Sequence, residues 1–159
     1  MRIGLALPHY GFSFPDGSEL AWSGLAGWAR RAEDLGFDSV WVSDHFFLSL
    51  GRYGGGDEIY GSVESLTALA ALAAVTERVR LGTLVLGSGF RHPAMVAKSA
   101  VTIDNLSGGR LDLGLGAGWY EDEYRALGYD FATLDERFSI LEEFVEVLSL
   151  LFGEKEPVT

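Results

Sequence analysis

The sequence has no cysteine, few cationic residues and no long hydrophobic run. Without cysteine among its 159 residues, the chain has no disulfides, thiolate metal ligands or cysteine nucleophile, as is typical of proteins of the reducing cytoplasm. It carries 12 lysines and arginines against 23 acidic residues, a net charge of -11, so it lacks the basic face that nucleic acids and anionic membranes require. No stretch approaches the ~20 apolar residues of a membrane span. We therefore expect a cytoplasmic protein with neither a nucleic-acid nor a membrane partner.

Metal ligands are also scarce. Three histidines without any cysteine form no recognisable metal cluster, so we expect no metal. The hydrophobic content of 48% is high enough for a substantial core. One globular domain is the first expectation for a chain of this length.

The central stretch of the chain is Asp38 to His45, which reads Asp-Ser-Val-Trp-Val-Ser-Asp-His. Its two-residue alternation places Val40, Val42 and Asp44 on one side and Trp41, Ser43 and His45 on the other, which predicts a strand. In parallel sheets, ligands gather at the carboxyl ends of strands. Asp44 and His45 occupy that end.

Strands and helices alternate along the chain. The predicted strands are Ile3–Leu7, the central stretch, Arg80–Leu86 and Leu111–Gly116. The predicted helices are Leu20–Leu35 closed by Gly36, Val63–Thr76 capped by Ser62, one from Pro93 to Ser107-Gly108-Gly109, and one from a Thr133–Glu136 capping box to Gly153. In the last helix Leu134, Phe138, Leu141, Val145, Leu148 and Phe152 form the predicted buried stripe. Residues 46–61 hold five glycines and no period, which predicts a mobile loop.

This order predicts an α/β fold with a parallel sheet and right-handed crossovers. Four units are half of an eight-unit barrel, which takes ~250 residues; the alternative is a small open sheet. Leu111, Leu113 and Leu115 face one way, whereas Asp112, Gly114 and Gly116 face the other. Bulk on one face and glycine on the other favour a (β/α) barrel of TIM type, because a doubly wound sheet has bulk on both faces.

Asp44 and His45 are the best acid/base candidates, because imidazole titrates near neutral pH and a strand end holds it at the mouth of the sheet. The alternative is that this pair only begins a solvated loop. His9 follows the first strand similarly, but a lone histidine after Pro8 is more often a loop residue. His92, at a helix start, is expected to be structural.

The glycine-rich run from Gly114 to Gly118 has Gly-x-Gly-x-Gly spacing, which differs from the dinucleotide fingerprint. Its missing side chains would let a flat ring or a neighbouring backbone approach the strand end closely. The alternative, glycines fitted to a crowded barrel interior, explains Gly114 better than Gly118. Glu121, Asp122 and Glu123 are expected at a solvated helix start, favoured there by the helix dipole.

Several motifs, in order, resemble the bacterial luciferase-like family of flavin- and deazaflavin-dependent oxidoreductases. They are Gly36-Phe-Asp-Ser-Val-Trp-Val-Ser-Asp-His45, Leu81-Gly-Thr-Leu-Val-Leu86, His92-Pro-Ala-Met-Val-Ala-Lys98, Gly108-Gly-Arg-Leu-Asp-Leu-Gly-Leu-Gly-Ala-Gly-Trp119 and Asp135-Glu-Arg-Phe-Ser-Ile-Leu-Glu-Glu143. The resemblance runs from residue 1 to about residue 159. It implies that residues 1–159 are the N-terminal half, the first four units, of a (β/α)₈ barrel domain.

The resemblance also implies site residues. His45 matches a histidine that acts as acid/base or as a ring contact, with Asp44 beside it. Leu84-Val85 matches a place where many members have a non-proline cis peptide against the cofactor ring. The implied cofactor-binding residues are Leu84, Val85, Leu86, Gly116, Ala117 and Gly118.

The implied function is hydride transfer between the reduced deazaflavin coenzyme F420 and a small organic substrate, with His45 handling the proton. An Asp-His pair resembles the deazaflavin branch. The alternatives are an FMN-dependent monooxygenase that uses dioxygen and a non-catalytic flavin-binding or interaction half-barrel. A half-barrel leaves strand edges open, so we expect a homodimer or a separate C-terminal half as partner.

Overall fold

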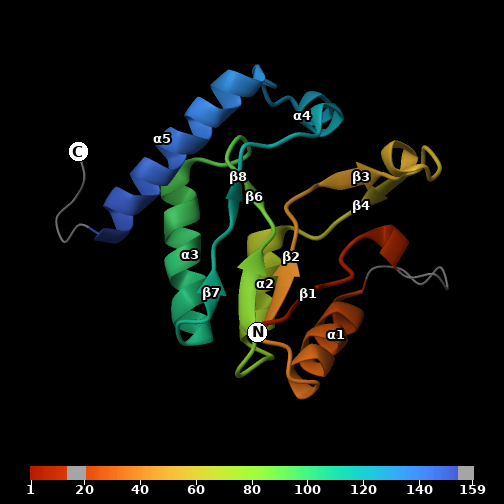
Figure 1. Ribbon diagram of the computed structural model, residues 1–159, viewed down its shortest axis with the longest axis vertical. Helices are drawn as coiled ribbons and strands as arrows, with labels where there is room; N and C mark the ends of the chain where they lie inside the picture. The colour runs from red at the N-terminus through yellow and green to blue at the C-terminus, as the bar shows by residue number, and fades with distance from the viewer. Residues whose placement is uncertain (14–20, 154–159) are drawn as a thin grey trace.

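The structure is a computed structural model that describes residues 1–13 and 21–153. Its centre is a four-stranded parallel sheet of β1 (Gly4–Ala6), β2 (Ser39–Val42), β5 (Arg80–Thr83) and β7 (Leu111–Asp112), in the order β1-β2-β5-β7 (Figure 1). The register aligns Val40 with Leu5 and Leu81. A parallel sheet with helical crossovers is the predicted α/β class, and the arrangement is that of a partial (β/α) barrel.

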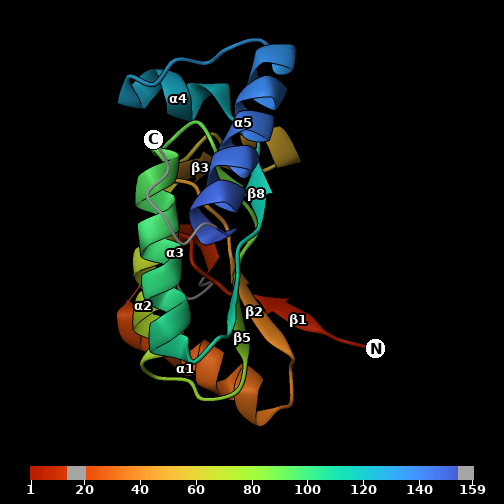
Figure 2. The same ribbon diagram turned by 90° about the vertical axis from the view of Figure 1, so that its left-hand side faces the viewer.

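Three helices cover one face of this sheet. They are α1 (Trp22–Asp34), α2 (Ser65–Ala73) and α3 (Pro93–Ser107), and Figure 2 shows them together on one side. The core between them and the sheet contains Leu25, Leu69, Val40, Val42 and Leu81, each at most 1% exposed. Within the described part of the chain, only this face is covered by helices. The bulky strand residues therefore pack against the helices, as the alternation in the sequence indicated.

The opposite face carries the small residues. A Cβ on Gly4 would stand 2.4 Å from Nε1 of Trp41, and one on Gly82 would stand 2.3 Å from its Cε3. The Trp41 indole therefore lies across both neighbouring strands, in space that their glycines leave open. This confirms that the glycines line the inner face.

Two predicted strands are each divided in two. The third continues from β5 into β6 (Leu86–Gly87), and the fourth continues from β7 into β8 (Leu115–Gly116), which pairs with β6 in parallel. The Leu84–Val85 peptide bond between β5 and β6 is cis, as the family resemblance implies.

The sequence signals for helix ends are largely confirmed. The backbone N–H of Thr133 donates to Glu136 at 2.9 Å and that of Glu136 donates to Thr133 Oγ1 at 3.4 Å, which is the capping box of α5 (Leu134–Gly153). Gly108 closes α3 and Gly36 follows α1, both with positive φ. The predicted start of α1 at Leu20 lies outside the described residues.

The second helix is capped differently from the prediction. Its N-cap is Glu64, whose carboxylate accepts from the N–H of Thr67 at 2.6 Å, and α2 ends at Ala73 instead of Thr76. Ser62 instead donates through its hydroxyl to the carbonyl of His9. The carboxylate of Glu64 reaches the free N–H of the first turn, so the cap lies two residues later than we expected.

Residues 46–61, where we expected a mobile loop, contain regular secondary structure. The segment contains β3 (Phe47–Ser49) and β4 (Ile59–Gly61), paired antiparallel, with the 3₁₀ turn η2 (Gly51–Tyr53) between them. A second 3₁₀ turn, η1 (Gly11–Ser13), lies against this hairpin through the bridge between Tyr10 and Ser62. Short strands with glycines at their ends lack a periodic pattern long enough to recognise.

The predicted buried stripe of α5 is mostly exposed. Leu148 is buried and Leu141 is half-buried, but Leu134, Phe138, Val145 and Phe152 are 57%, 51%, 43% and 50% exposed. The amphipathic pattern predicts the helix correctly, but burial requires a partner surface. Among the described residues, α5 packs against α3 and leaves most of that stripe uncovered. No helix of the described part is both long and apolar enough to cross a membrane.

Candidate functional site

The carboxyl ends of the strands lie near the β3–β4 hairpin and α4 (Glu121–Leu127) (Figure 1). The residues at these strand ends line a cleft. It encloses about 130 Å³. The residues that line it come from the segment after β2, the segment from the β5–β6 connection to the turn after β6, and the segment from β8 to α4. They are Asp44, His45, Leu84, Val85, Gly87, Phe90, Gly116, Gly118, Trp119, Tyr120, Glu123 and Tyr124. The structure thus brings most of the predicted site residues to one place.

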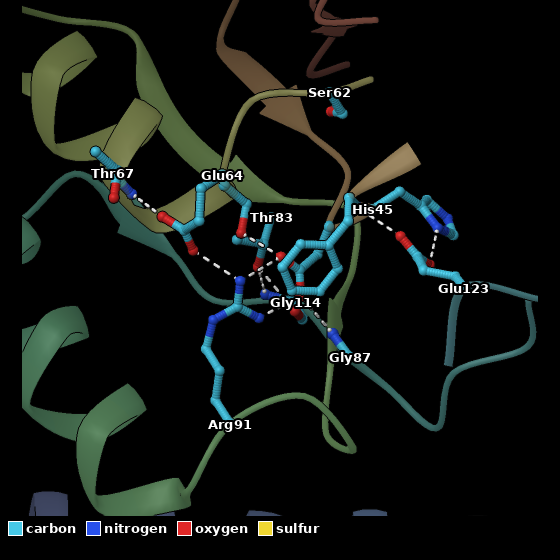
Figure 3. A network of polar contacts seen from close by, with 12 residues as sticks. His45, Ser62, Glu64, Thr67, Thr83, Gly87, Arg91, Gly114 and Glu123 are labelled. Atoms are coloured by element: carbon cyan, nitrogen blue, oxygen red, sulfur yellow. Dashed lines mark hydrogen bonds and ion pairs between the residues drawn. The ribbon is translucent and has the colours of Figure 1, made fainter. Parts of the chain in front are cut away.

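His45 is held by a buried carboxylate. Its Nδ1 lies 2.9 Å from Oε2 of Glu123, whose side chain is 0% exposed, and the two side chains point toward each other in Figure 3. The other oxygen of Glu123 accepts the backbone N–H groups of Phe46 and Phe47. The prediction that Glu123 belongs to a solvated helix start is therefore wrong, because its side chain turns inward beneath the hairpin.

The contact between His45 and Glu123 fixes which ring nitrogen carries the proton. A carboxylate accepts, so Nδ1 of His45 donates, and Nε2 of the neutral ring is left as an acceptor. The edge of the His45 ring also meets the Trp119 ring, with centroids 5.5 Å apart. His45 is therefore an oriented imidazole in the cleft, with one nitrogen available for proton transfer.

Asp44 also lines the cleft, and its carboxylate belongs to a polar network with Arg91, which Figure 3 labels. It accepts both terminal nitrogens of Arg91 at 2.6 and 2.8 Å, the hydroxyl of Ser65 at 2.7 Å and the N–H of Gly87 at 3.0 Å. Arg91 also donates to Glu64 at 2.7 Å. With four donors on its two oxygens, Asp44 ties β2 to α2 and to the turn after β6.

The charge of Arg91 is secured by these partners. Burial disfavours the guanidinium, but hydrogen bonds and attraction from Asp44 and Glu64 outweigh that effect, so the pKa of Arg91 is raised. Asp44 is 6% exposed. A buried carboxylate paired in this way acts as a structural anchor that holds the neighbouring His45 in place.

His9 lies in the loop after β1, as expected, but it is buried, at 4% exposure. Its Nδ1 donates to the Leu7 carbonyl at 2.5 Å, so its Nε2 accepts from Ser43, whose hydroxyl lies 2.7 Å away and whose N–H lies 3.1 Å away. The Ser43 hydroxyl in turn accepts from Tyr10. Burial lowers the pKa of His9 and raises that of Tyr10, so both groups are held neutral.

The glycines of the run from Gly114 to Gly118 are explained by internal contacts. A Cβ on Gly114 would stand 2.3 Å from the Thr83 carbonyl oxygen, and one on Gly116 would stand 2.6 Å from Val85. Gly118 has a φ of +76°, and a Cβ there would stand 2.1 Å from the hydroxyl of Tyr124. The close approach that we expected is thus made by the protein's own groups, while Gly116 and Gly118 still line the cleft.

The other predicted cofactor-binding residues divide into two sets. Leu84 and Val85, on either side of the cis bond, line the cleft and are 55% and 40% exposed. Leu86 is fully buried in the core, and neither it nor Ala117 lines the cleft. The exposed pair forms an apolar wall.

Tyr124 lines the cleft without having been predicted. It is 2% exposed, and its hydroxyl has no hydrogen-bond partner among residues 1–13 and 21–153. Burial and the nearby Glu123 raise the pKa of Tyr124 to about 12. Tyr120 precedes α4 as its N-cap, and Glu123 and Tyr124 follow it three and four residues later. This spacing of one helix face was the sequence signal for Glu123 and Tyr124.

Within the described residues, no group of three or more His, Asp or Glu side chains is arranged to hold a metal ion. What the cleft offers is an oriented imidazole, an apolar wall and a buried hydroxyl. These features suit the binding of an uncharged flat group and the movement of a proton.

The sequence model of the luciferase-like monooxygenase family matches residues 1–159. The chain is 39% identical over 129 residues to the F420-dependent glucose-6-phosphate dehydrogenase of Amycolatopsis mediterranei, which covers 80% of this chain and 37% of that protein. It is 36% identical over 142 residues to the 4-hydroxyprotoasukamycin monooxygenase of Streptomyces nodosus, which covers 86% of this chain and 35% of that protein.

The fold is likewise similar to a solved F420-dependent secondary alcohol dehydrogenase in complex with an F420-acetone adduct. The TM-score is 0.79 at 26% identity, over 99% of this chain and 44% of that one. The chain therefore spans less than half the length of these relatives. The motifs, the cleft and the match over residues 1–159 together show that the chain belongs to the luciferase-like monooxygenase family.

Proposed function

We propose that this chain forms the N-terminal half of an F420-dependent oxidoreductase and provides its proton-transferring group and one wall of its ring-binding site. The observation that carries the proposal is the pairing of His45 with the buried Glu123 in a cleft at the carboxyl ends of the strands. An F420-dependent relative at 39% identity supports the cofactor.

The residues of the cleft fit a deazaflavin ring. Leu84 and Val85 offer an exposed apolar surface against which a flat ring can pack. The orphaned hydroxyl of Tyr124 offers a hydrogen-bond donor from a buried position. Apolar walls with a few placed polar groups are the usual composition of cofactor sites.

When bound, a deazaflavin supplies hydride chemistry, and the protein supplies orientation and proton handling. In alcohol oxidation, Nε2 of His45 would accept the hydroxyl proton, and the oxidised deazaflavin would supply the acceptor for the hydride that leaves the substrate carbon. In the reverse direction Nε2 would return that proton. Glu123 stabilises the imidazolium through Nδ1. Asp44, anchored by Arg91, keeps the end of β2 in position, and Trp119 and Tyr120 reduce the access of water.

The test of the proposal begins with binding. Purified protein is titrated with F420 and, separately, with FMN, followed by fluorescence. We expect saturable binding of F420 that is tighter than that of FMN. Binding of neither cofactor would contradict the proposal for this chain.

The role of His45 is tested by turnover with F420 and a secondary alcohol, the substrate class of the solved structural relative. We expect His45→Gln to lower turnover by about 10²–10⁴-fold, the usual contribution of a general base. The matched control is His92→Gln, because His92 is exposed at the start of α3 and does not line the cleft. Equal rates in the two variants would rule out His45 as the proton acceptor.

A second candidate is an FMN-dependent monooxygenase that uses dioxygen. It is supported by the 36% identity to 4-hydroxyprotoasukamycin monooxygenase. Tight FMN binding together with substrate-dependent oxygen uptake would favour the monooxygenase over an F420-dependent oxidoreductase. The third alternative is a non-catalytic flavin-binding or interaction module. Such a module would bind the cofactor but would turn over no substrate.

The partner that we propose is a second copy of the chain or a C-terminal half of the barrel. Among the described residues, β1 and β7 each have a neighbour on one side only, and the inner face of the sheet is not covered by a helix (Figure 2). Open edges favour pairing with further strands. Sedimentation of the purified chain distinguishes a homodimer from a monomer that requires the other half.

A further inference from the structure

The structure contains a buried tyrosine hydroxyl that has no hydrogen-bond partner among the described residues. Three buried side-chain atoms in the described part of the chain have none: Ser88 Oγ, Tyr124 OH and Arg137 Nε. Of these three residues, Tyr124 is the one that lines the cleft. A buried hydroxyl without a hydrogen bond destabilises a folded protein, so such a group calls for an explanation.

The position of this hydroxyl is determined by two glycines. A Cβ on Gly118 would stand 2.1 Å from Tyr124 OH, and a Cβ on Gly89 would stand 2.8 Å from it. Any other residue at either position would displace the hydroxyl. The Tyr124 ring itself is held by Phe90 and Phe131, with centroids 4.4 and 5.2 Å away. The hydroxyl is therefore fixed in place, although it has no hydrogen-bond partner within residues 1–13 and 21–153.

The surroundings decide what kind of group it can bind. Burial and the charge of Glu123 raise the pKa of Tyr124 to about 12, so the hydroxyl is a donor at neutral pH. The cleft already contains the carboxylates of Glu123 and Asp44, and Arg91 is committed to Asp44 and Glu64. An anionic ligand group is disfavoured there, whereas a neutral acceptor such as a carbonyl oxygen is suitable.

We propose that the Tyr124 hydroxyl donates a hydrogen bond to a carbonyl oxygen at the edge of a flat heterocyclic ring bound in the cleft, and that Tyr124 is therefore an affinity-determining residue of this site. The inference rests on the proposed function, because it takes the ring to be that of a flavin or deazaflavin. It adds a specific atom, contributed by α4, to the wall formed by Leu84 and Val85.

The test is Tyr124→Phe, which removes only the hydroxyl. In the free protein we expect this variant to be more stable than the wild type, with a Tm higher by about 2–4 °C, because it removes an unpaired buried polar group. Toward the cofactor that the wild type binds, F420 or FMN, we expect its affinity to fall about five- to tenfold, the effect of one neutral hydrogen bond.

The matched control is Tyr129→Phe. Tyr129 belongs to the same aromatic cluster, packing against Phe90 and Phe46, but it does not line the cleft. We expect its cofactor affinity to equal that of the wild type. A Tyr124→Phe variant that binds as tightly as the wild type, or that is less stable when free, would overturn the inference while leaving the proposed function intact.

A phosphate-free ligand separates the ring from the tail of the cofactor. The titrations are repeated with riboflavin, or with the corresponding deazaflavin riboside if F420 is the cofactor that binds. We expect Tyr124→Phe to lose the same factor in affinity for this ligand. A loss confined to the phosphorylated cofactor would assign the hydroxyl to the phosphate and overturn the ring assignment. A wild type that binds neither cofactor would overturn both proposals.

Discussion

Nδ1 of His45 lies 2.9 Å from Oε2 of Glu123, although 78 residues separate them in the sequence. The carboxylate is fully buried and also receives the N–H groups of the two residues that follow His45. One side chain of α4 thus fixes both the imidazole and the backbone from which it projects. The same contact determines which nitrogen of His45 is available in the cleft.

Glu123→Gln tests this control of the tautomer. The amide oxygen of glutamine can accept the two backbone N–H groups, and its NH₂ group then donates to Nδ1, which places the His45 proton on Nε2. We expect ¹⁵N NMR of the imidazole at neutral pH to show this change of tautomer. The control is Glu121→Gln in the same helical turn, because Glu121 pairs with Arg125 at the surface. An unchanged tautomer in Glu123→Gln would show that the contact does not orient the ring.

Arg91→Met tests the anchor behind the cleft. The substitution leaves the Asp44 carboxylate buried without its bidentate partner, and breaking a buried pair in this way costs about 3–5 kcal/mol. We expect a loss of that size in the free energy of unfolding measured with urea. Arg125→Met is the control, since its pair with Glu121 is exposed and contributes little. Similar small losses in both variants would mean that the Asp44 network does not stabilise the fold.

The buried His9 predicts a pH dependence of stability. Burial lowers its pKa in the folded state below the ordinary value of 6.5, so the unfolded chain takes up the proton first as the pH falls. The contribution of His9 to stability is complete above pH 6.5 and is lost as the pH decreases from there toward the lowered pKa. We expect the urea midpoint to fall less between pH 7.5 and 5.5 in His9→Gln than in the wild type. Parallel curves would indicate that His9 does not contribute.

Gly118→Ala separates backbone strain from steric conflict. Gly118 and Gly128 have almost the same φ, +76° and +78°, but a Cβ on Gly128 meets nothing within 4 Å, whereas one on Gly118 meets the Tyr124 hydroxyl. Gly128→Ala should therefore cost about 1–2 kcal/mol for the left-handed backbone alone. Gly118→Ala should cost about 1–3 kcal/mol more, because it also displaces a packed ring.

Urea unfolding of both alanine variants measures this difference. Combining Gly118→Ala with Tyr124→Phe should recover part of the additional loss, since the nearest conflicting atom is then absent. Equal costs at positions 118 and 128 would show that the Tyr124 ring moves aside freely. Its hydroxyl would then not be held in the place that the further inference requires.

The sequence predicted the fold well where the signals are local. The parallel order of strands, the capping box at Thr133 and the glycine at the end of α3 are confirmed. The β3–β4 hairpin was missed because three-residue strands have no recognisable period. The burial of α5 was overestimated because amphipathicity shows which face seeks a partner, and among the described residues most of that face has none.

For the site, the sequence identified the place and part of the membership. His45, Leu84, Val85, Gly116 and Gly118 line the cleft as a group. Asp44 lies there too, but its oxygens are engaged by Arg91 behind the cleft, which makes it an anchor. Leu86 and Ala117 do not line the cleft, and Leu86 is buried in the core instead.

By itself the sequence determined the α/β class, the alternation of bulky and small strand faces and the strand end where the chemistry gathers. These properties depend on residues only a few positions apart, through strand and helix periodicity and capping. Only the tertiary structure decided that Glu123 orients His45, that Arg91 anchors Asp44 and that the Tyr124 hydroxyl has no hydrogen-bond partner in the part of the chain that the structure describes. Those outcomes depend on how α4 and the start of α3 pack against the sheet, and long-range packing leaves no periodic pattern in the chain.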